Sequence, residues 1–234
     1  MFIVLRKRHL LLCVLVVCFS ISLTLYRNRP VSVFAPGLPV TVVVDAGHGG
    51  EDGGAVSADG VKESQLNLAV SVRLDQILRF TGQRTVLTRS EDISVCEEGL
   101  DTIKARKASD LRNRVKLVNE TEGAVLISIH QNSLPSSPVT HGAQVFWNNR
   151  EGAEELALCI QEVLNAAVNP GNEKHPKAIP ASIYLTKHAQ APSVVVECGF
   201  LSNPAETSLL QQPSHQLKLA AAVAAGSLYC LKGA

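Results

Sequence analysis

Short apolar runs recur along the chain from residue 40 onward, each bounded by glycine, proline or polar residues. Residues 40–45 (VTVVVD), 124–129 (AVLISI) and 193–197 (SVVVE) are continuous rather than alternating runs of apolar, largely β-branched residues. Such runs are typical of strands that are buried on both faces of a sheet. The complete set of expected strands is 40–45, 84–88, 124–129, 143–147, 183–185 and 193–197.

Amphipathic segments separate these runs. After residue 64, apolar residues recur at helical spacing as far as Thr81-Gly82, where a glycine can end the helix. Asn203-Pro204 combines a capping residue with a proline suited to the first helical turn, and Ser214 is expected to cap a final helix. Further helices are expected around 111–118 and over 153–167. The alternation predicts an α/β fold, a single domain with a central, mostly parallel sheet flanked by helices.

The N-terminal segment has a different character. Three basic residues at 6–8 precede an almost wholly apolar segment at 10–26, and the uncharged span of 18 residues is just long enough to cross a bilayer. The excess of basic residues before the span favours a cytoplasmic N-terminus. We therefore expect a cytoplasmic segment at 1–9, a transmembrane anchor at 10–26, a proline-containing linker at 27–39 and an extracytoplasmic domain at 40–234. Secretion after cleavage of a signal peptide is the alternative.

The distribution of charge along the chain argues against one class of partner, nucleic acid. Residues 1–29 hold five basic residues and no acid, which leaves 17 of the 22 basic side chains against 21 acidic ones in the rest of the chain. A mildly acidic body argues against nucleic-acid binding.

Beyond the apolar segment, the cysteines follow neither a zinc-ribbon spacing nor a dense disulfide framework, so their pairing stays open: Cys96, Cys159, Cys198 and Cys230.

Three polar side chains lie where predicted strands end. His48 follows the first strand, His130 directly follows AVLISI, and Glu197 closes SVVVE. The carboxyl ends of parallel strands meet at one edge of a sheet, where ligands collect. Two imidazoles and a carboxylate are the ligands of a catalytic zinc site. Glu63, at the start of the next helix, is an alternative carboxylate, and spacing alone leaves open which acid binds metal and which acts as the general base.

Two other readings of these motifs are less well supported. The glycine-rich segment 47–54 lacks both a dinucleotide-binding glycine pattern and a Gly-Lys-Ser/Thr sequence, and Glu51 and Asp52 would repel phosphate. Cys198 could be a nucleophile, but as the neighbour of Glu197 on a strand it should face the opposite side of the sheet.

Four blocks carry a resemblance to a known family. They are 42–54 (VVVDAGHGGEDGG), 62–68 (KESQLNL), 128–132 (SIHQN) and 196–203 (VECGFLSN), and they resemble the signature blocks of zinc-dependent N-acetylmuramoyl-L-alanine amidases of type 3. The resemblance implies a single α/β domain with a mixed sheet and one bound Zn²⁺. It implies the following roles: His48, Glu63 and His130 as zinc ligands, Glu197 as catalytic acid/base. Asn132, two residues after His130, is expected to position the substrate or a ligand.

A finer resemblance concerns the biological setting. Residues 110–114 (DLRNR) and 184–189 (YLTKHA), and the layout of one anchor and one catalytic domain, resemble the germination-specific amidases of the spore cortex. This implies hydrolysis of the amide between the lactyl group of N-acetylmuramic acid and L-alanine in peptidoglycan, before a polysaccharide deacetylase acts in muramic-δ-lactam formation. There are three alternatives: vegetative wall remodelling, a zinc hydrolase that acts on another amide such as a stem-peptide bond, and a non-catalytic, membrane-tethered peptidoglycan-binding protein.

Overall fold

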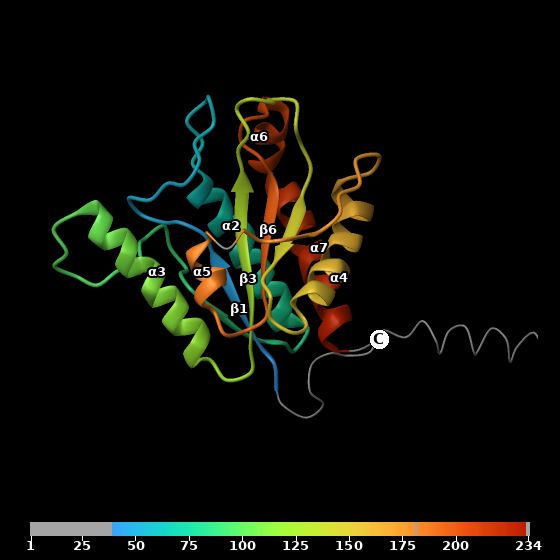
Figure 1. The fold of residues 1–234 in the computed structure, drawn as a ribbon. Helices are drawn as coiled ribbons and strands as arrows, with labels where there is room; N and C mark the ends of the chain where they lie inside the picture. Colours follow the sequence, from blue (N-terminus) through green and yellow to red (C-terminus); the bar gives the residue numbers. More distant parts are fainter. Residues whose placement is uncertain (1–38, 181, 233–234) are drawn as a thin grey trace, which may run out of the picture.

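Six strands form one mixed sheet at the centre of the molecule (Figure 1). The computed structural model describes residues 39–180 and 182–232. The strands are β1 (Thr41–Ala46), β2 (Arg84–Leu87), β3 (Ala124–Asn132), β4 (Gln144–Trp147), β5 (Lys177–Ala178) and β6 (Ser193–Phe200). Their order is β2-β1-β3-β6-β4-β5; the first four run parallel, β4 is antiparallel to β6, and β5 is parallel to β4. The sheet is therefore parallel around its centre and mixed overall.

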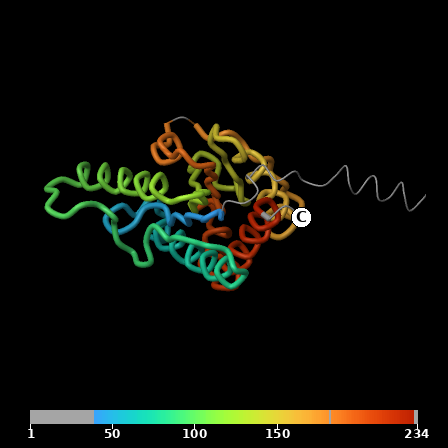
Figure 2. Tube along the Cα trace, turned by 90° about the horizontal axis from the view of Figure 1, so that it is seen from below, coloured from blue at the N-terminus to red at the C-terminus, as the bar shows by residue number. Residues whose placement is uncertain are grey.

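Helices cover both faces of this sheet. They are α2 (Glu63–Phe80), α3 (Ile103–Glu120), α4 (Ala153–Val168), α5 (Tyr184–His188), α6 (Pro204–Leu210) and α7 (Pro213–Lys232). Figures 1 and 2 show α2, α4 and α7 on one face and α3 and α5 on the other. Because both faces are covered, alternate residues of one strand enter different cores: Val42 and Val44 pack with the first group of helices, and Val43 packs with the second. This explains why the central strands are continuous apolar runs.

The structure confirms the α/β architecture and corrects some of its details. The strand expected at 183–185 is wrong, because this segment begins α5, with helical hydrogen bonds from Lys187 N to Ile183 O and from Ala189 N to Leu185 O. Ser214 lies inside α7, which begins at Pro213, rather than at its cap. The two-residue strand β5 was not predicted, since it is too short to show a hydrophobic pattern.

Strands β3 and β6 extend past their predicted ends, to Asn132 and Phe200. His130, which was expected just after its strand, and Glu197, which was expected as the last residue of its strand, therefore both lie within strands, where the neighbouring strand fixes their backbone.

No helix in the described part of the chain is both long and apolar enough to cross a bilayer. The anchor expected at 10–26 lies outside the described residues and stays a prediction.

Candidate active site

The carboxyl-terminal edge of the central strands brings together the side chains expected there. His130 of β3 pairs in register with Glu197 of β6, and Ser128 pairs with Asp45 of β1. Residues paired in register project to the same face of a sheet. His130 and Glu197 are consequently side by side on the face that α3 and α5 cover, and His48 reaches the same edge from the loop after β1.

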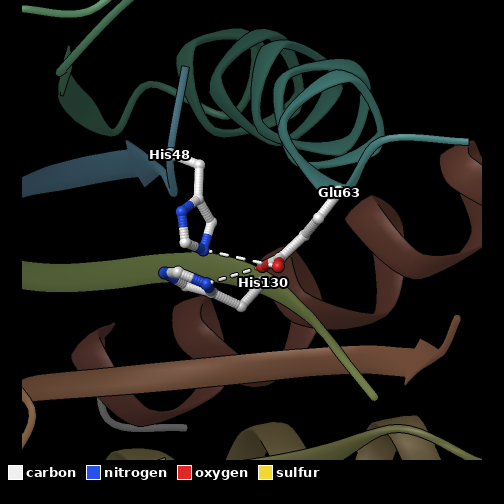
Figure 3. A group of neighbouring side chains, drawn as sticks. All are labelled: His48, Glu63 and His130. Carbon is white, nitrogen blue, oxygen red and sulfur yellow. Dashed lines mark hydrogen bonds and ion pairs between the residues drawn. The ribbon is translucent and has the colours of Figure 1, made fainter. Parts of the chain in front are cut away.

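Glu63 reaches this edge from the opposite side of the sheet. It is the first residue of α2, and its carboxylate lies beside both imidazoles and contacts each of them (Figure 3). Glu63 Oε2 is 3.3 Å from Nε2 of His48, and Glu63 Oε1 is 2.8 Å from Nδ1 of His130. One ligand atom from each of the three residues lies within 4.8 Å of the others. Two imidazole nitrogens and one carboxylate oxygen form the donor set of a catalytic zinc centre, which leaves a fourth position open.

The backbone around His48 is shaped for close approach. His48 has φ of 62°, the only non-glycine residue with positive φ in the described segments. This left-handed conformation carries strain for a side chain with Cβ and requires support from its surroundings. At Gly47 a Cβ would overlap the ring of His130, so only glycine lets the loop pass against this imidazole.

Asp52 orients the His48 ring. Its Oδ2 accepts from Nδ1 of His48 at 2.9 Å, which leaves Nε2 directed toward Glu63 and His130. Lys107 of α3 pairs with the same Asp52 oxygen at 3.0 Å. A carboxylate on the far nitrogen of a metal-binding histidine fixes its tautomer and ring orientation. Asp52 was not among the predicted site residues, although it lies one short turn after His48.

Glu63 is held by donors as well as by the histidines. Its Oε2 accepts from the Ala55 backbone N–H at 2.8 Å, and its Oε1 accepts from the Gln131 backbone N–H and from Asn67 Nδ2, each at 3.1 Å. Asn67 is fully buried one turn further along α2 and also donates to the Gly47 carbonyl at 3.1 Å. Asn67 therefore joins the loop that carries His48 to the first turn of α2, which carries Glu63. The sequence signal for it was its four-residue spacing from Glu63.

Arg114 of α3 binds the His48 loop from the other side. It is buried and donates to the carbonyls of Ala46 at 2.8 Å and His48 at 2.7 Å. Its charge is balanced by Asp45 at 2.5 Å and Asp110 at 2.6 Å. Burial alone would lower the pKa of Arg114, but these two carboxylates outweigh it and raise the pKa above its usual range. The guanidinium thus stays charged and supports the left-handed turn at His48.

Arg89 supports the same loop from a second direction. It is buried and donates to the carbonyls of Ala46 at 2.9 Å, Gly47 at 3.1 Å and Ser64 at 2.8 Å. Its contact with Ser64 ties the loop to the first turn of α2, next to Glu63. Planar, multidentate guanidinium groups suit such clusters of carbonyl oxygens.

The ionisable groups of the site shift one another's pKa values strongly. Burial by itself would raise the pKa of Glu63 and lower that of His48. Hydrogen bonds outweigh burial in both cases: His130 and His48 hold the pKa of Glu63 well below its usual range, while Asp52 and Glu63 raise the pKa of His48 to about 9. The carboxylate of Glu63 is therefore ionised, as a metal ligand must be.

Glu197 differs from Glu63 in its surroundings. Its Oε2 is buried and has no hydrogen-bond partner in the structure. Burial raises the pKa of Glu197 to about 7, against the opposing effect of His130. A buried, unpartnered carboxyl oxygen is costly unless it serves another group, and a carboxyl group that titrates near neutral pH suits proton transfer.

A cavity of about 410 Å³ connects these groups, lined by His48, Glu63, His130, Asn132 and Glu197 among others. His130, Asn132 and Glu197 also line a neighbouring recess of about 250 Å³, whose remaining walls are apolar: Phe146, Ile179, Pro180, Ile183 and Val195. The cleft is therefore polar on one side of Glu197 and apolar on the other. Cys198 lies outside it, with its thiol 3.8 Å from the Val196 carbonyl, and burial raises its pKa above its usual range.

Comparisons with known proteins agree with this arrangement. The germination-specific N-acetylmuramoyl-L-alanine amidase of Bacillus subtilis (strain 168) is 37% identical over 188 residues, covering 80% of this chain and 78% of the relative. The CwlD amidase from Clostridioides difficile, solved in complex with the GerS lipoprotein, has a TM-score of 0.78 and 35% identity over 82% of this chain and 98% of that chain. An N-acetylmuramoyl-L-alanine amidase from Clostridium difficile 630 has a TM-score of 0.71 and 26% identity over 84% of this chain and 98% of that chain.

The family model for N-acetylmuramoyl-L-alanine amidases matches residues 42–228, which include β6, all of β1 except Thr41, and every side chain of the cleft described above. Together with the sequence identity and the shared fold, this match shows that the chain belongs to the N-acetylmuramoyl-L-alanine amidase family.

Proposed function

We propose that the chain hydrolyses the amide bond between the lactyl group of N-acetylmuramic acid and L-alanine in peptidoglycan, with a single zinc ion held by His48, Glu63 and His130. The observation that carries the proposal is the convergence of this donor set with the unpartnered carboxyl oxygen of Glu197 in one cleft.

The residues present fit zinc by their chemistry. The three ligand atoms are two imidazole nitrogens and one carboxylate oxygen, and the supporting contacts of Asp52 and Asn67 are of the kind that surround metal ligands. When bound in such a site, zinc polarises a carbonyl and lowers the pKa of a bound water from about 15.7 toward about 7.

Glu197 transfers protons in this mechanism. In its ionised form it accepts a proton from the attacking water, and in its protonated form it donates that proton to the departing alanine nitrogen. A pKa of about 7 lets the same group take both roles near neutral pH. General acid–base assistance of this kind contributes ~10²–10⁴-fold to the rate. Asn132, which lines the cleft beside Glu197, positions the substrate.

The relatives suggest a setting in the spore. One relative is germination-specific by name, which favours a role in spore-cortex peptidoglycan over general wall remodelling. On this proposal the catalytic domain acts outside the cytoplasm, membrane-anchored through residues 10–26 or secreted, and a polysaccharide deacetylase acts after it. The solved relative bound to a lipoprotein supports a protein partner for this chain as well.

Product analysis tests the proposal. The purified protein is incubated with defined peptidoglycan, and the released ends are identified by mass. The proposal expects free lactyl muramic acid and an intact stem peptide that begins with L-alanine. New termini inside the stem peptide would instead show a peptidase, and tight binding to peptidoglycan without any released product would show a non-catalytic wall-binding protein.

A further inference from the structure

Two long helices, α4 and α7, pack closely on the face of the sheet opposite α3 and α5 (Figures 1 and 2). They approach closely at Gly226 of α7, where a Cβ would lie 2.6 Å from Cα of Ile160 and 2.7 Å from the carbonyl oxygen of Cys159. Cβ atoms do not come this close to backbone, so glycine is what allows the two helices to touch. The backbones of the two helices are thus in direct contact beside Cys159.

Cys230 lies one helical turn after Gly226 and hence on the same side of α7. Because Gly226 lies against the Cys159 backbone, this turn of α7 places the Cys230 thiol beside the Cys159 thiol, and each thiol influences the pKa of the other. Cys230 is 7% exposed and Cys159 is partly buried. Neither thiol lines the catalytic cleft.

The surroundings of the two sulfurs slow all of their thiolate chemistry. Burial raises the pKa of Cys230 to about 12 and also raises the pKa of Cys159, so both thiols are protonated at neutral pH and are poor nucleophiles toward substrates. In an oxidising compartment, two neighbouring thiols still form a disulfide slowly, through the small thiolate fraction of each, and burial then shields the bridge from reductants.

We propose that Cys159 and Cys230 form an intramolecular disulfide that joins α4 to the C-terminal turn of α7. The two-electron oxidant is a small disulfide of the oxidised-glutathione type. The Cys159 thiolate attacks one sulfur of that disulfide and releases one thiolate; the Cys230 thiolate then attacks the Cys159 sulfur and releases the second. Two protons leave the protein, and the oxidant becomes two thiols.

The bridge would stabilise the part of the fold that contains β6 by constraining the unfolded chain. It closes a loop of about 70 residues that contains β6, and so Glu197, and long loops lose the most chain entropy in the unfolded state when they are closed. The expected gain in Tm is about 5–10 °C for a domain of this size. This inference does not depend on the amidase activity or on a bound metal.

Mass spectrometry and thermal unfolding of the full chain test it. One sample is equilibrated with oxidised glutathione at mildly alkaline pH, and a second is unfolded and refolded in the same redox buffer, which gives the oxidant access to both thiols. Remaining thiols are alkylated, and the protein is digested without reductant. We expect a linked pair of peptides that contain Cys159 and Cys230 and separate on reduction, with the gain in Tm lost in C159S and C230S and kept in the control C96S.

Three results would overturn the proposal. The first is complete alkylation of Cys159 and Cys230 in the refolded sample. The second is a bridge from either cysteine to Cys96 or Cys198. The third is a gain in Tm on oxidation of C159S that equals the gain of the unsubstituted chain.

Discussion

Replacing Arg114 with methionine should weaken zinc binding although Arg114 is not a ligand. Methionine is similar in length and apolar, but it cannot donate to the His48 carbonyl or pair with Asp45. Breaking a buried ion pair by removing one partner costs about 3–5 kcal/mol of unfolding free energy. Asp45 then keeps only the hydroxyls of Ser128 at 2.6 Å and Thr88 at 2.9 Å.

The effect on metal binding has a separate origin. Without Arg114 the left-handed backbone of His48 loses a hydrogen bond that supports it, so His48 Nε2 is no longer held toward Glu63. Loss of such supporting contacts costs about 10–100-fold in metal affinity. Zinc affinity is measured by competition with a chromophoric chelator, and stability by urea unfolding of the metal-free protein.

The choice of variants separates these two effects. Arg114→Lys keeps a positive charge near Asp45 but cannot reach both carbonyls, so it should retain more stability than Arg114→Met while still losing zinc affinity. Arg112→Met, an exposed position on the same helix, is the matched control and should change neither quantity appreciably. Zinc affinity of the folded Arg114→Met and Arg114→Lys proteins equal to that of Arg112→Met would refute the positioning role.

Two further predictions concern the site. Gly47→Ala places a Cβ against the His130 ring, so we expect the folded protein to lose zinc; the zinc content of the purified variant checks this, and a full complement of zinc would count against the geometry. Glu197 must be ionised to accept a proton from water, and its pKa is raised to about 7. Because the ionised fraction falls tenfold per pH unit below this pKa, kcat/KM should fall roughly tenfold per pH unit below about pH 7. A profile that stays flat down to the ordinary glutamate pKa would contradict this, and the zinc content must be monitored at each pH.

The sequence predicts the fold where one physical rule decides the structure. β1, the apolar part of β3 and the first half of β6 are continuous β-branched runs, and a parallel sheet covered on both faces requires such runs. The strand predicted at 183–185 was wrong because a short apolar stretch fits either a strand or a helix. The helical hydrogen bond from Lys187 N to Ile183 O distinguishes the two, and it is seen only in the structure.

The residues of the site were also only partly predictable from the sequence. The rule that parallel strand ends share an edge was sufficient to group His48, His130 and Glu197. It was not sufficient to place Glu63, because that depends on how α2 begins above the sheet. The roles of Arg114 and Asn67 depend on backbone carbonyls of distant loops, and no spacing rule predicts which carbonyls a buried donor will meet.

The most direct test of the account is the rate at which Glu197→Gln releases L-alanine-terminated stem peptide from purified muropeptide, measured against the unsubstituted chain at equal zinc content. The account predicts one zinc ion per chain in both proteins and a rate that is ~10²–10⁴-fold lower in the variant. An unchanged rate in the zinc-loaded variant would contradict the role of Glu197.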